Sequence, residues 1–400
     1  MKQWKKNLII ILVTAIISGC IASIGTFVVT NILFLVGHHD MFTKMREVKS
    51  TLDNLYLYDY DYDKYVDGAI SGAVASLDEP YTEYYSKKEF DSLKESLSGD
   101  FVGIGASVIS NEANQIQVVN PIEGGAAIEA GIQSGDIIAV IDNKPYTGEE
   151  LDDAVAHMRG EEGTTVNIVV LRGEEELPFT LTRRRIHNKS VAYEKLDGEI
   201  GYIQIDSFTT PDDEGAPSAY DEFQVAYDEL TKSQKVQKLI IDLRDNGGGD
   251  ADVVTKIADI LVGEGVVFSM EYKDGIKEVK KSTKGECNLP IVVLVNGNSA
   301  SASELLSGCL RDHGKAKLVG TKTFGKGVVQ SVFPFSDGTG LKLTVAKYYT
   351  PNGICVQDNG LDPDYVCEPL DKYKNFGISI IPRDEDVQLA KAIEVLNDWK

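Results

Sequence analysis

The sequence predicts a multidomain α/β protein preceded by a membrane segment. The first forty residues contain an uncharged apolar run from Leu8 to Val36. Short β-type runs separated by glycines follow between 101 and 186, and strand-like and helical stretches alternate after Ile186. Such alternation implies a sheet covered by helices. Because 400 residues exceed one typical compact domain, four parts are expected: 1–39, 40–98, 99–186 and 187–400.

Charge and composition exclude several classes of function. Asp and Glu outnumber Lys and Arg by 62 to 40, and the net charge of −22 repels a phosphate backbone, so nucleic acid is not an expected partner. The five cysteines show no C-x-x-C spacing, and the five histidines form no H-E-x-x-H motif. We therefore expect neither a metal site nor a cofactor.

The N-terminal run predicts an uncleaved transmembrane helix. Lysines at positions 2, 5 and 6 precede Leu8–Val36, which is long enough to cross a bilayer and longer than the apolar core of a secretory signal. The positive flank stays in the cytoplasm, which places the chain from residue 40 onward on the extracytoplasmic side of a cell membrane. The stretch "ISGC" offers an alternative, lipid attachment at Cys20. An extracytoplasmic location also leaves open a disulfide between Cys355 and Cys367.

Two smaller parts are expected to follow this segment. Residues 40–98 read as a small helical domain with a break at 78–81, and its tyrosine-rich stretch 54–65 is interpreted as ordinary packing, with a substrate-facing patch as the alternative. Residues 99–186 contain five or six β-type runs and one amphipathic helix at 148–160. This content suits a small, partly open barrel or sandwich.

Three serines on alternate positions mark the candidate nucleophile in the C-terminal part. The stretch "VNGNSASASELLSG", 295–308, follows the buried-strand signal "IVVLV" and opens a helical stretch. The serines therefore lie on a sharp strand-to-helix turn, where free backbone N–H groups and the positive helix end face any nearby negative charge. The geometry is that of a nucleophile elbow, although the G-x-S-x-G pattern is absent.

A serine nucleophile needs a proton acceptor, and no histidine is suitably placed. His313 lies at the far end of the same helix, about 18 Å from Ser301 at 1.5 Å per residue. His157 and His187 lie in or beside the small β domain, where surface or helix-end roles are expected. A buried lysine can serve instead when burial lowers its pKa, and Lys326, flanked by two glycines, is the candidate. The alternative for Lys326 is a solvated loop lysine.

A glycine cluster offers a second group of backbone donors. The stretch "DLRDNGGGD", 242–250, follows a buried strand and precedes a helix, the place where α/β sheets bind ligands. Its N–H groups are expected to complete an oxyanion hole with the amide of Ala302.

Together these motifs resemble the C-terminal processing peptidases, membrane-associated or secreted serine proteases with a Ser-Lys dyad. The resemblance covers 65–370 and rests on motifs in the same order as in the family: "GAISGAVASLDEPYTEYY", "FVGIGASV", "IGYIQIDSF", "DLRDNGGG", "NGNSASASELLSG", "GTKTFGKGVVQ" and "TPNGICVQDNGLDPDYV". It implies a PDZ domain at 99–186, inserted before an α/β protease core of the ClpP/crotonase-like type at 187–400.

The resemblance also assigns roles at the active site. It implies Ser301 as the nucleophile, Lys326 as the general base and Gln330 as the residue that orients the lysine. Ala302 and Gly248 are the implied oxyanion donors. The loop departs from the family, which usually has proline where this chain has Gly247, so its pre-organisation is reduced. Glu304, in the first turn of the helix, is expected to be structural because a carboxylate suits the helix dipole.

A PDZ domain binds a peptide as an added strand and holds its terminal carboxylate on backbone N–H groups. The implied carboxylate loop consists of Gly103, Ile104 and Gly105. Val155 and Met158 are expected to line a pocket for an apolar terminal side chain. Arg159 matches the position that, in the family, links bound peptide to the protease core, with a plain helix-end role as the alternative.

The sequence thus predicts a bacterial, membrane-anchored, extracytoplasmic endopeptidase that recognises exposed apolar protein C-termini. The alternative is a catalytically silent PDZ scaffold on a degenerate protease fold. A homodimer is left open, because relatives form dimers or larger rings.

Overall fold

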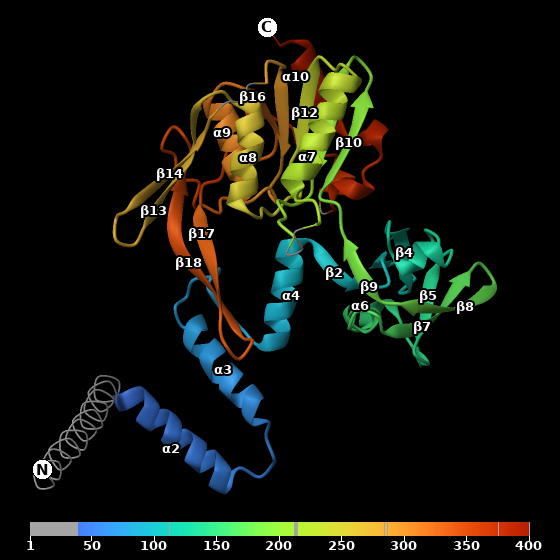
Figure 1. The fold of residues 1–400 in the computed structure, drawn as a ribbon, viewed down its shortest axis with the longest axis vertical. Helices are drawn as coiled ribbons and strands as arrows, with labels where there is room; N and C mark the ends of the chain where they lie inside the picture. The colour runs from blue at the N-terminus through green and yellow to red at the C-terminus, as the bar shows by residue number, and fades with distance from the viewer. Residues whose placement is uncertain are drawn as a thin grey trace, which may run out of the picture. The chain divides into compact units, whose positions relative to one another are not determined.

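The computed structural model describes residues 39–111, 113–211, 215–283, 285, 287–374 and 376–399 (Figure 1). The chain divides into two compact units, Met1–Ala69 and Ile70–Lys400, so this boundary falls inside the expected helical domain. The expected membrane segment at 8–36 lies outside the described residues. Within the described part of the chain, no helix is both long and apolar enough to span a bilayer.

The N-terminal unit contains helix α2 (His39–Leu55) and the start of α3 (Tyr62–Ala75). The tyrosines between these helices contact one another: Tyr56 packs edge-on against Tyr58 and Tyr60, and Tyr60 against Tyr65. Tyr56 and Tyr58 remain 53% and 68% exposed, and α3 has no buried residue. The expected packing into a helical core is therefore wrong for this stretch, because the rings cover each other at the surface.

Two short elements open the second unit. Strand β1 (Glu83–Tyr85) pairs with β18 (Gly340–Tyr349). Helix α4 (Lys87–Ser98) follows, begins with Ser86 bonded to Glu89, and ends at Gly99, whose φ of 75° suits glycine. The predicted break before this helix is confirmed, but strand β1 was not expected, since three residues are too short for a sequence pattern.

The small β domain has the predicted mixture of strands and one clear helix. Its antiparallel sheet has the order β3-β4-β5-β7-β8, with β6 paired to β5. The strands are β3 (Ala106–Ser110), β4 (Ile116–Pro121), β5 (Ile137–Ile141), β6 (Lys144–Pro145), β7 (Thr165–Arg172) and β8 (Glu175–Thr182). Two helices, α5 (Ala126–Glu129) and α6 (Leu151–Met158), pack on this sheet, and Met158 lies in the shared core.

A separate two-stranded ribbon carries the chain into and out of this domain. Strand β2 (Asp100–Gly103) pairs with β9 (Arg184–His187). The His187 imidazole contacts Asp100 through Nδ1 at 2.9 Å and Glu222 through Nε2 at 2.8 Å. Burial lowers the pKa of His187, but the hydrogen bonds that the ring donates to Glu222 and Asp100 outweigh burial and raise the pKa overall. The expected surface role is thus wrong, because His187 joins the ribbon to helix α7 (Ala219–Asp228).

The C-terminal part is built on a six-stranded sheet with the order β10-β11-β12-β15-β16-β19. Pairing is parallel from β11 to β19 and antiparallel at the β10 edge. The strands are β10 (Val191–Leu196), β11 (Ile200–Ile205), β12 (Lys238–Asp242), β15 (Ile291–Val295), β16 (Ala316–Gly320) and β19 (Tyr365–Val366). Every residue of β15 is buried, as its uninterrupted apolar run predicts.

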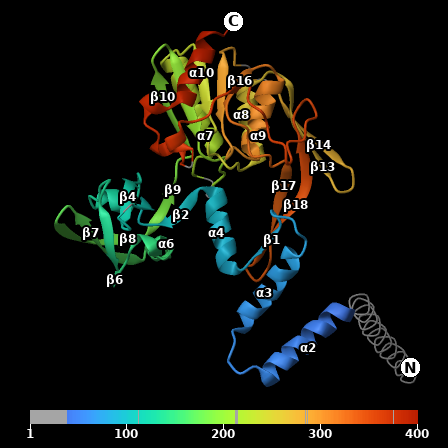
Figure 2. The ribbon, with the colours of Figure 1, turned by 180° about the vertical axis from the view of Figure 1, so that it is seen from behind.

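Helices cover both faces of this sheet (Figure 2). On one face α7, α8 (Ala251–Leu261) and α9 (Ala302–Asp312) share a large core with the sheet. On the other face α10 (Val387–Asn397) buries Leu389, Val395 and Leu396 against it. The predicted sheet with covering helices is confirmed.

A second sheet lies beyond α8 and α9 and carries the segment that follows the lysine loop. Its order is β1-β18-β13-β14, with β17 (Val328–Pro334) also paired to β18. Strands β13 (Gly265–Tyr272) and β14 (Lys277–Ser282) complete it. Phe268 of β13 and Tyr348 of β18 join the core formed by α8 and α9.

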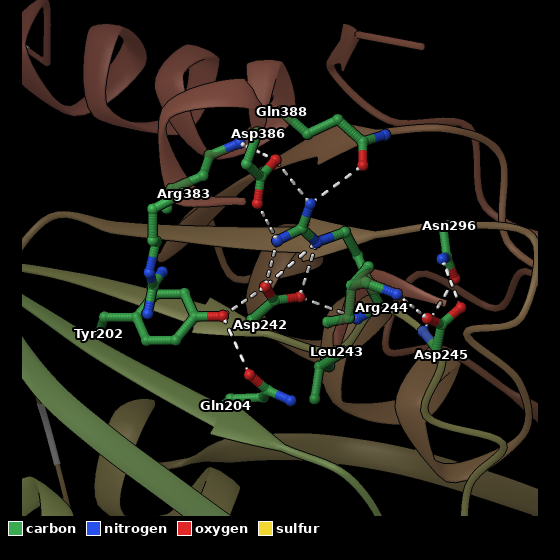
Figure 3. Close-up of polar contacts among 12 residues, drawn as sticks. Tyr202, Gln204, Asp242, Leu243, Arg244, Asp245, Asn296, Arg383, Asp386 and Gln388 are labelled. Carbon is green, nitrogen blue, oxygen red and sulfur yellow. Dashed lines mark hydrogen bonds and ion pairs between the residues drawn. The ribbon is translucent and has the colours of Figure 1, made fainter. Parts of the chain in front are cut away.

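A buried polar network ties the C-terminal segment to the first sheet (Figure 3). Arg244 Nη2 donates to Asp242 at 2.6 Å and to Asp386 at 2.8 Å. Gln388 accepts from Arg244 Nη1 at 3.1 Å, and the Tyr202 hydroxyl donates to Asp242 at 2.7 Å. The start of α10 is therefore fixed at the carboxyl end of β12, next to the glycine cluster.

Candidate active site

Ser301 lies at the turn between β15 and α9, as predicted. Its φ of 55° places a non-glycine residue in the left-handed region, a strain that recurs at functional sites. The neighbouring serines hold the turn against the loop after β12: Ser299 Oγ donates to the Leu243 carbonyl at 2.7 Å and Ser303 Oγ to the Asn246 carbonyl at 2.9 Å. Only the middle serine faces the cavity of about 670 Å³ that Lys326 also lines.

Glu304 connects this turn to the lysine loop. Its fully buried carboxylate accepts the Ser301 amide and the Lys326 amide at 2.9 Å each. It also accepts the Gly325 amide at 2.8 Å and the Thr323 hydroxyl at 2.6 Å. The expected structural role of Glu304 is confirmed. Besides interacting with the helix dipole, the carboxylate binds the lysine loop. The sequence reasoning missed the three bonds from the lysine loop, because donors 19 to 22 residues away leave no local pattern.

Tyr348 makes a second connection between the same two backbone segments. The single proton of its buried hydroxyl is shared between the Lys326 carbonyl at 2.6 Å and the Ser301 carbonyl at 3.1 Å, as a bifurcated hydrogen bond. The nucleophile turn and the lysine loop are thus joined from both sides of their backbones.

Lys326 occupies a partly buried position in the loop between β16 and β17. Burial lowers the pKa of its ammonium, and the charge of Lys342 lowers it further, whereas Glu79 and Glu304 act in the opposite direction. The net shift is downward, as a general base requires. Its Nζ lies 4.8 Å from the centroid of the Tyr81 ring. Among the described residues, no hydrogen bond joins Nζ to Ser301.

The glycines beside Lys326 allow a close approach to the segment at 356–360. A Cβ on Gly325 would lie 2.9 Å from the Gly360 nitrogen, and a Cβ on Gly327 would lie 2.3 Å from the Gln357 nitrogen. Both distances are too short for a side chain, so the sequence expectation of a tightly approaching backbone is confirmed.

Gln330 lies on β17 and lines the same cavity as Lys326. Its Nε2 donates to Thr344 Oγ1 at 3.2 Å. No hydrogen bond to Lys326 is present within the described ranges. The structure therefore brings the three predicted residues to one cavity without bonding them to one another.

The two predicted oxyanion donors differ in availability. Ala302 begins α9, so its amide has no acceptor within the helix. A Cβ on Gly248 would lie 2.9 Å from Ser301 Cβ, which shows how closely the glycine loop approaches. However, the Gly248 amide donates to Asn246 Oδ1 at 2.8 Å. In this conformation the Gly248 donor is therefore occupied by the side chain of Asn246, which forms a local turn.

The histidines excluded by sequence are engaged elsewhere. His313 Nε2 lies 2.7 Å from the Val266 carbonyl, and His157 Nδ1 lies 3.1 Å from the Tyr146 hydroxyl. In the described part of the chain, no group of three or more His, Cys, Asp or Glu side chains is placed to hold a metal ion.

All the predicted peptide-binding residues meet in a cavity of about 210 Å³ on the small β domain. It is lined by Gly103, Ile104, Gly105, Val155, Met158 and Arg159. Arg159 follows the last residue of α6, and its guanidinium lies 3.0 Å from Glu95 of α4 and 5.2 Å from the Phe101 ring centroid. The arginine therefore connects the groove to α4 rather than only closing its own helix.

A serine on a strained strand-to-helix turn of an α/β core, together with a β domain that carries a groove, is the arrangement expected of a serine peptidase with a PDZ domain. Residues 199–367 match the model of peptidase family S41, and 102–182 match a PDZ domain model. A probable CtpA-like serine protease of Staphylococcus saprophyticus is 34% identical over 390 residues, which cover 96% of this chain and 76% of the relative. The chain belongs to peptidase family S41.

One further relative agrees with this assignment, and one solved structure shares the fold. A probable CtpA-like serine protease of Staphylococcus aureus strain N315 is 39% identical over 345 residues, which cover 85% of this chain and 66% of the relative. A putative S41 protease from Bacteroides fragilis aligns in structure with a TM-score of 0.59 over 86% of this chain and 93% of that chain. At 19% sequence identity, that likeness shows the fold alone.

Proposed function

We propose that this S41 peptidase is an endopeptidase in which Ser301 and Lys326 form a catalytic dyad. The observation that carries the proposal is the buried Glu304 carboxylate, which binds the backbone amides of both residues. A group that holds nucleophile and base in one frame limits how far apart they can move. The lowered pKa of Lys326, caused mainly by burial, supports its role as the base.

The proposed reaction is acyl transfer through a covalent intermediate. The neutral Lys326 amine removes the Ser301 hydroxyl proton, and Oγ attacks the substrate carbonyl carbon. The amide of Ala302 stabilises the oxyanion, and the protonated lysine returns the proton to the leaving amine. Water then attacks the acyl-enzyme, releases the acid product and restores the serine.

The conformation described here is proposed to be a resting one. For the reaction, Ser301 Oγ and Lys326 Nζ must approach to hydrogen-bonding distance, and the Gly248 amide must leave Asn246 to join the oxyanion hole. The extra glycine beside Gly248 leaves the loop free to make that change. Peptide binding in the PDZ groove is the proposed trigger, supported by the Arg159–Glu95 contact between groove and α4.

The proposed substrates are extracytoplasmic proteins with exposed apolar C-termini, and the proposed anchor is the membrane segment at 8–36. The apolar lining of the PDZ groove by Val155 and Met158 supports this preference. A core of the ClpP/crotonase-like type is proposed for the same chain. The second candidate function is a catalytically silent scaffold. It is less well supported, because a scaffold does not need a lysine with a lowered pKa beside Ser301.

Cleavage of an unfolded protein with an apolar C-terminus tests the dyad. We expect the full chain to cleave it, and Ser301→Ala and Lys326→Ala each to reduce kcat by at least about a thousandfold. Wild-type activity should fall as the pH drops through the lowered Lys326 pKa, because the protonated amine cannot accept the serine proton. Cleavage that persists in either variant assigns the chemistry to other residues.

A further inference from the structure

A row of polar side chains leads from the turn before β1 across β18 to Gln330, which lines the cavity. In the pairing of β17 with β18, Gln330 lies opposite Thr344. The turn before β1 also contacts Thr344, whose amide donates to Thr82 Oγ1 at 3.1 Å and whose hydroxyl donates to Glu79 at 2.9 Å. Tyr81 belongs to the same turn, and Lys326 Nζ lies 4.8 Å from the centroid of its ring.

Glu79 fixes the direction of the hydrogen bonds in the row. Its carboxylate accepts the Thr82 hydroxyl at 2.6 Å, the Thr344 hydroxyl at 2.9 Å and the Tyr81 amide at 3.3 Å. Burial raises the pKa of Glu79, but the bonds from Thr82 and Thr344 outweigh burial, so the pKa is lowered overall. An ionised carboxylate can only accept hydrogen bonds.

The bond to Glu79 determines whether the Thr344 hydroxyl donates to Gln330 or accepts from it. A threonine hydroxyl carries one proton, and that of Thr344 is donated to Glu79. Toward Gln330, Thr344 Oγ1 can therefore only accept. This selects the amide orientation in which Gln330 Nε2 points to Thr344 and Oε1 is the end left for another partner.

That orientation matters for the chemistry of a lysine base. A neutral amine has a single lone pair, which must accept the serine proton. If an N–H of Lys326 is donated to Gln330 Oε1, the lone pair stays available. In the opposite amide orientation, Gln330 would present N–H donors that compete with Ser301 for the same lone pair.

We propose that Glu79 and Thr344 are positioning residues that set the Gln330 amide so that its Oε1 receives a hydrogen bond from Lys326. The inference rests on the proposed Ser301–Lys326 dyad and extends it to the segment before β1. The positioning acts through two hydrogen bonds in sequence: Gln330 Nε2 donates to the Thr344 hydroxyl, and the Thr344 hydroxyl donates to the Glu79 carboxylate.

The test compares substitutions at Thr344 in the full chain. Thr344→Val removes the hydroxyl at nearly constant shape, whereas Thr344→Ser keeps it as the matched control. We expect kcat to fall about tenfold in Thr344→Val with KM unchanged, since about one oriented hydrogen bond is lost. Thr344→Ser should stay within about twofold of wild type, because its hydroxyl can make the same two bonds.

A double-mutant cycle separates positioning from a general structural effect. Once Gln330→Leu has removed the amide, Thr344→Val should cause no further loss of kcat. Losses that multiply in the double variant would overturn the proposal, as would a wild-type kcat in Thr344→Val. If Thr344→Val does not fold, Glu79→Gln takes its place in the cycle, because a neutral amide no longer fixes the direction of the Thr344 hydroxyl.

The same assays distinguish this inference from the dyad on which it rests. If Ser301→Ala and Lys326→Ala abolish cleavage while the losses at Thr344 and Gln330 multiply, the positioning role is wrong and the dyad stands. If Ser301→Ala or Lys326→Ala retains cleavage, the dyad itself is wrong.

Discussion

At the scale of single residues, Glu304 is one of two side chains, with Tyr348, that join the Ser301 turn to the lysine loop. We expect Glu304→Gln to lower the free energy of unfolding by about 2–4 kcal/mol, because the substituted amide presents N–H groups to donors that now have one acceptor fewer. The value of kcat should fall as well, since the loop that carries Lys326 loses an anchor. Urea unfolding and steady-state kinetics measure the two effects.

A matched control for this substitution is Glu394→Gln on α10, where the glutamate is exposed and pairs with Lys391 at the surface. That change should alter stability by less than about 0.5 kcal/mol. Equal effects at Glu304 and Glu394 would show that the four bonds to Glu304 contribute little.

The residues of the site differ in how well the sequence predicts them. Ser301 and Lys326 lie in local motifs, and the turn and the glycine-flanked loop found around them follow from those motifs. The orientation of the Gly248 amide depends on the conformation of the Asn246 side chain, which the sequence leaves open. The role of Thr344 was not predicted, because it depends on the pairing of β17 with β18 and on a contact with the turn before β1, which is 265 residues away in the chain.

At the scale of elements, the segment from 376 to 388 binds the loop that follows β12. Asp245 accepts the Ile378 amide at 2.7 Å and the Asn298 side chain at 2.9 Å, so one carboxylate joins this segment to the loop before the nucleophile. Arg244, the preceding residue, is held by Asp386 and Gln388. This C-terminal support could not be predicted, because Arg244 and Asp386 are 142 residues apart.

The Arg244–Asp386 pair gives this support a measurable pH dependence. Burial raises the pKa of Asp386, but the hydrogen bonds and charge of Arg244 outweigh burial and lower it overall. A carboxyl with a lowered folded pKa stabilises the protein above its unfolded pKa and loses that contribution as the pH falls through the folded value.

We therefore expect Asp386→Asn to destabilise the fold at neutral pH by about 3 kcal/mol, because it leaves part of a buried guanidinium unpaired. The difference from wild type should shrink below the ordinary aspartate pKa, which thermal unfolding between acidic and neutral pH would show. Asp384→Asn is the control, as Asp384 is exposed in the same segment. A pH-independent difference would show that the charge of Asp386 is unimportant.

At the scale of the whole molecule, the PDZ groove and the catalytic cavity lie in separate domains joined by the β2–β9 ribbon. His187 ties this ribbon to α7, and Arg159 ties the groove to α4. Leu93 and Leu97 of α4 also line the catalytic cavity. Helix α4 is therefore in contact with both the groove, through Arg159, and the cavity that Ser301 and Lys326 line.

A substitution in the groove tests whether capture of a C-terminus governs cleavage. Val155 lines the groove and is partly exposed, so Val155→Glu places a charge where an apolar terminal side chain is expected to bind, with little disturbance of the core. We expect KM for a protein substrate with an apolar C-terminus to rise at least about tenfold. Cleavage of a short peptide that spans only the catalytic cavity should keep its kcat/KM.

Ile109→Glu is the matched control, because Ile109 is 47% exposed on β3 of the same domain and does not line the groove. If Val155→Glu slowed both substrates equally, or Ile109→Glu raised KM as much, the groove would not be the site of C-terminal recognition.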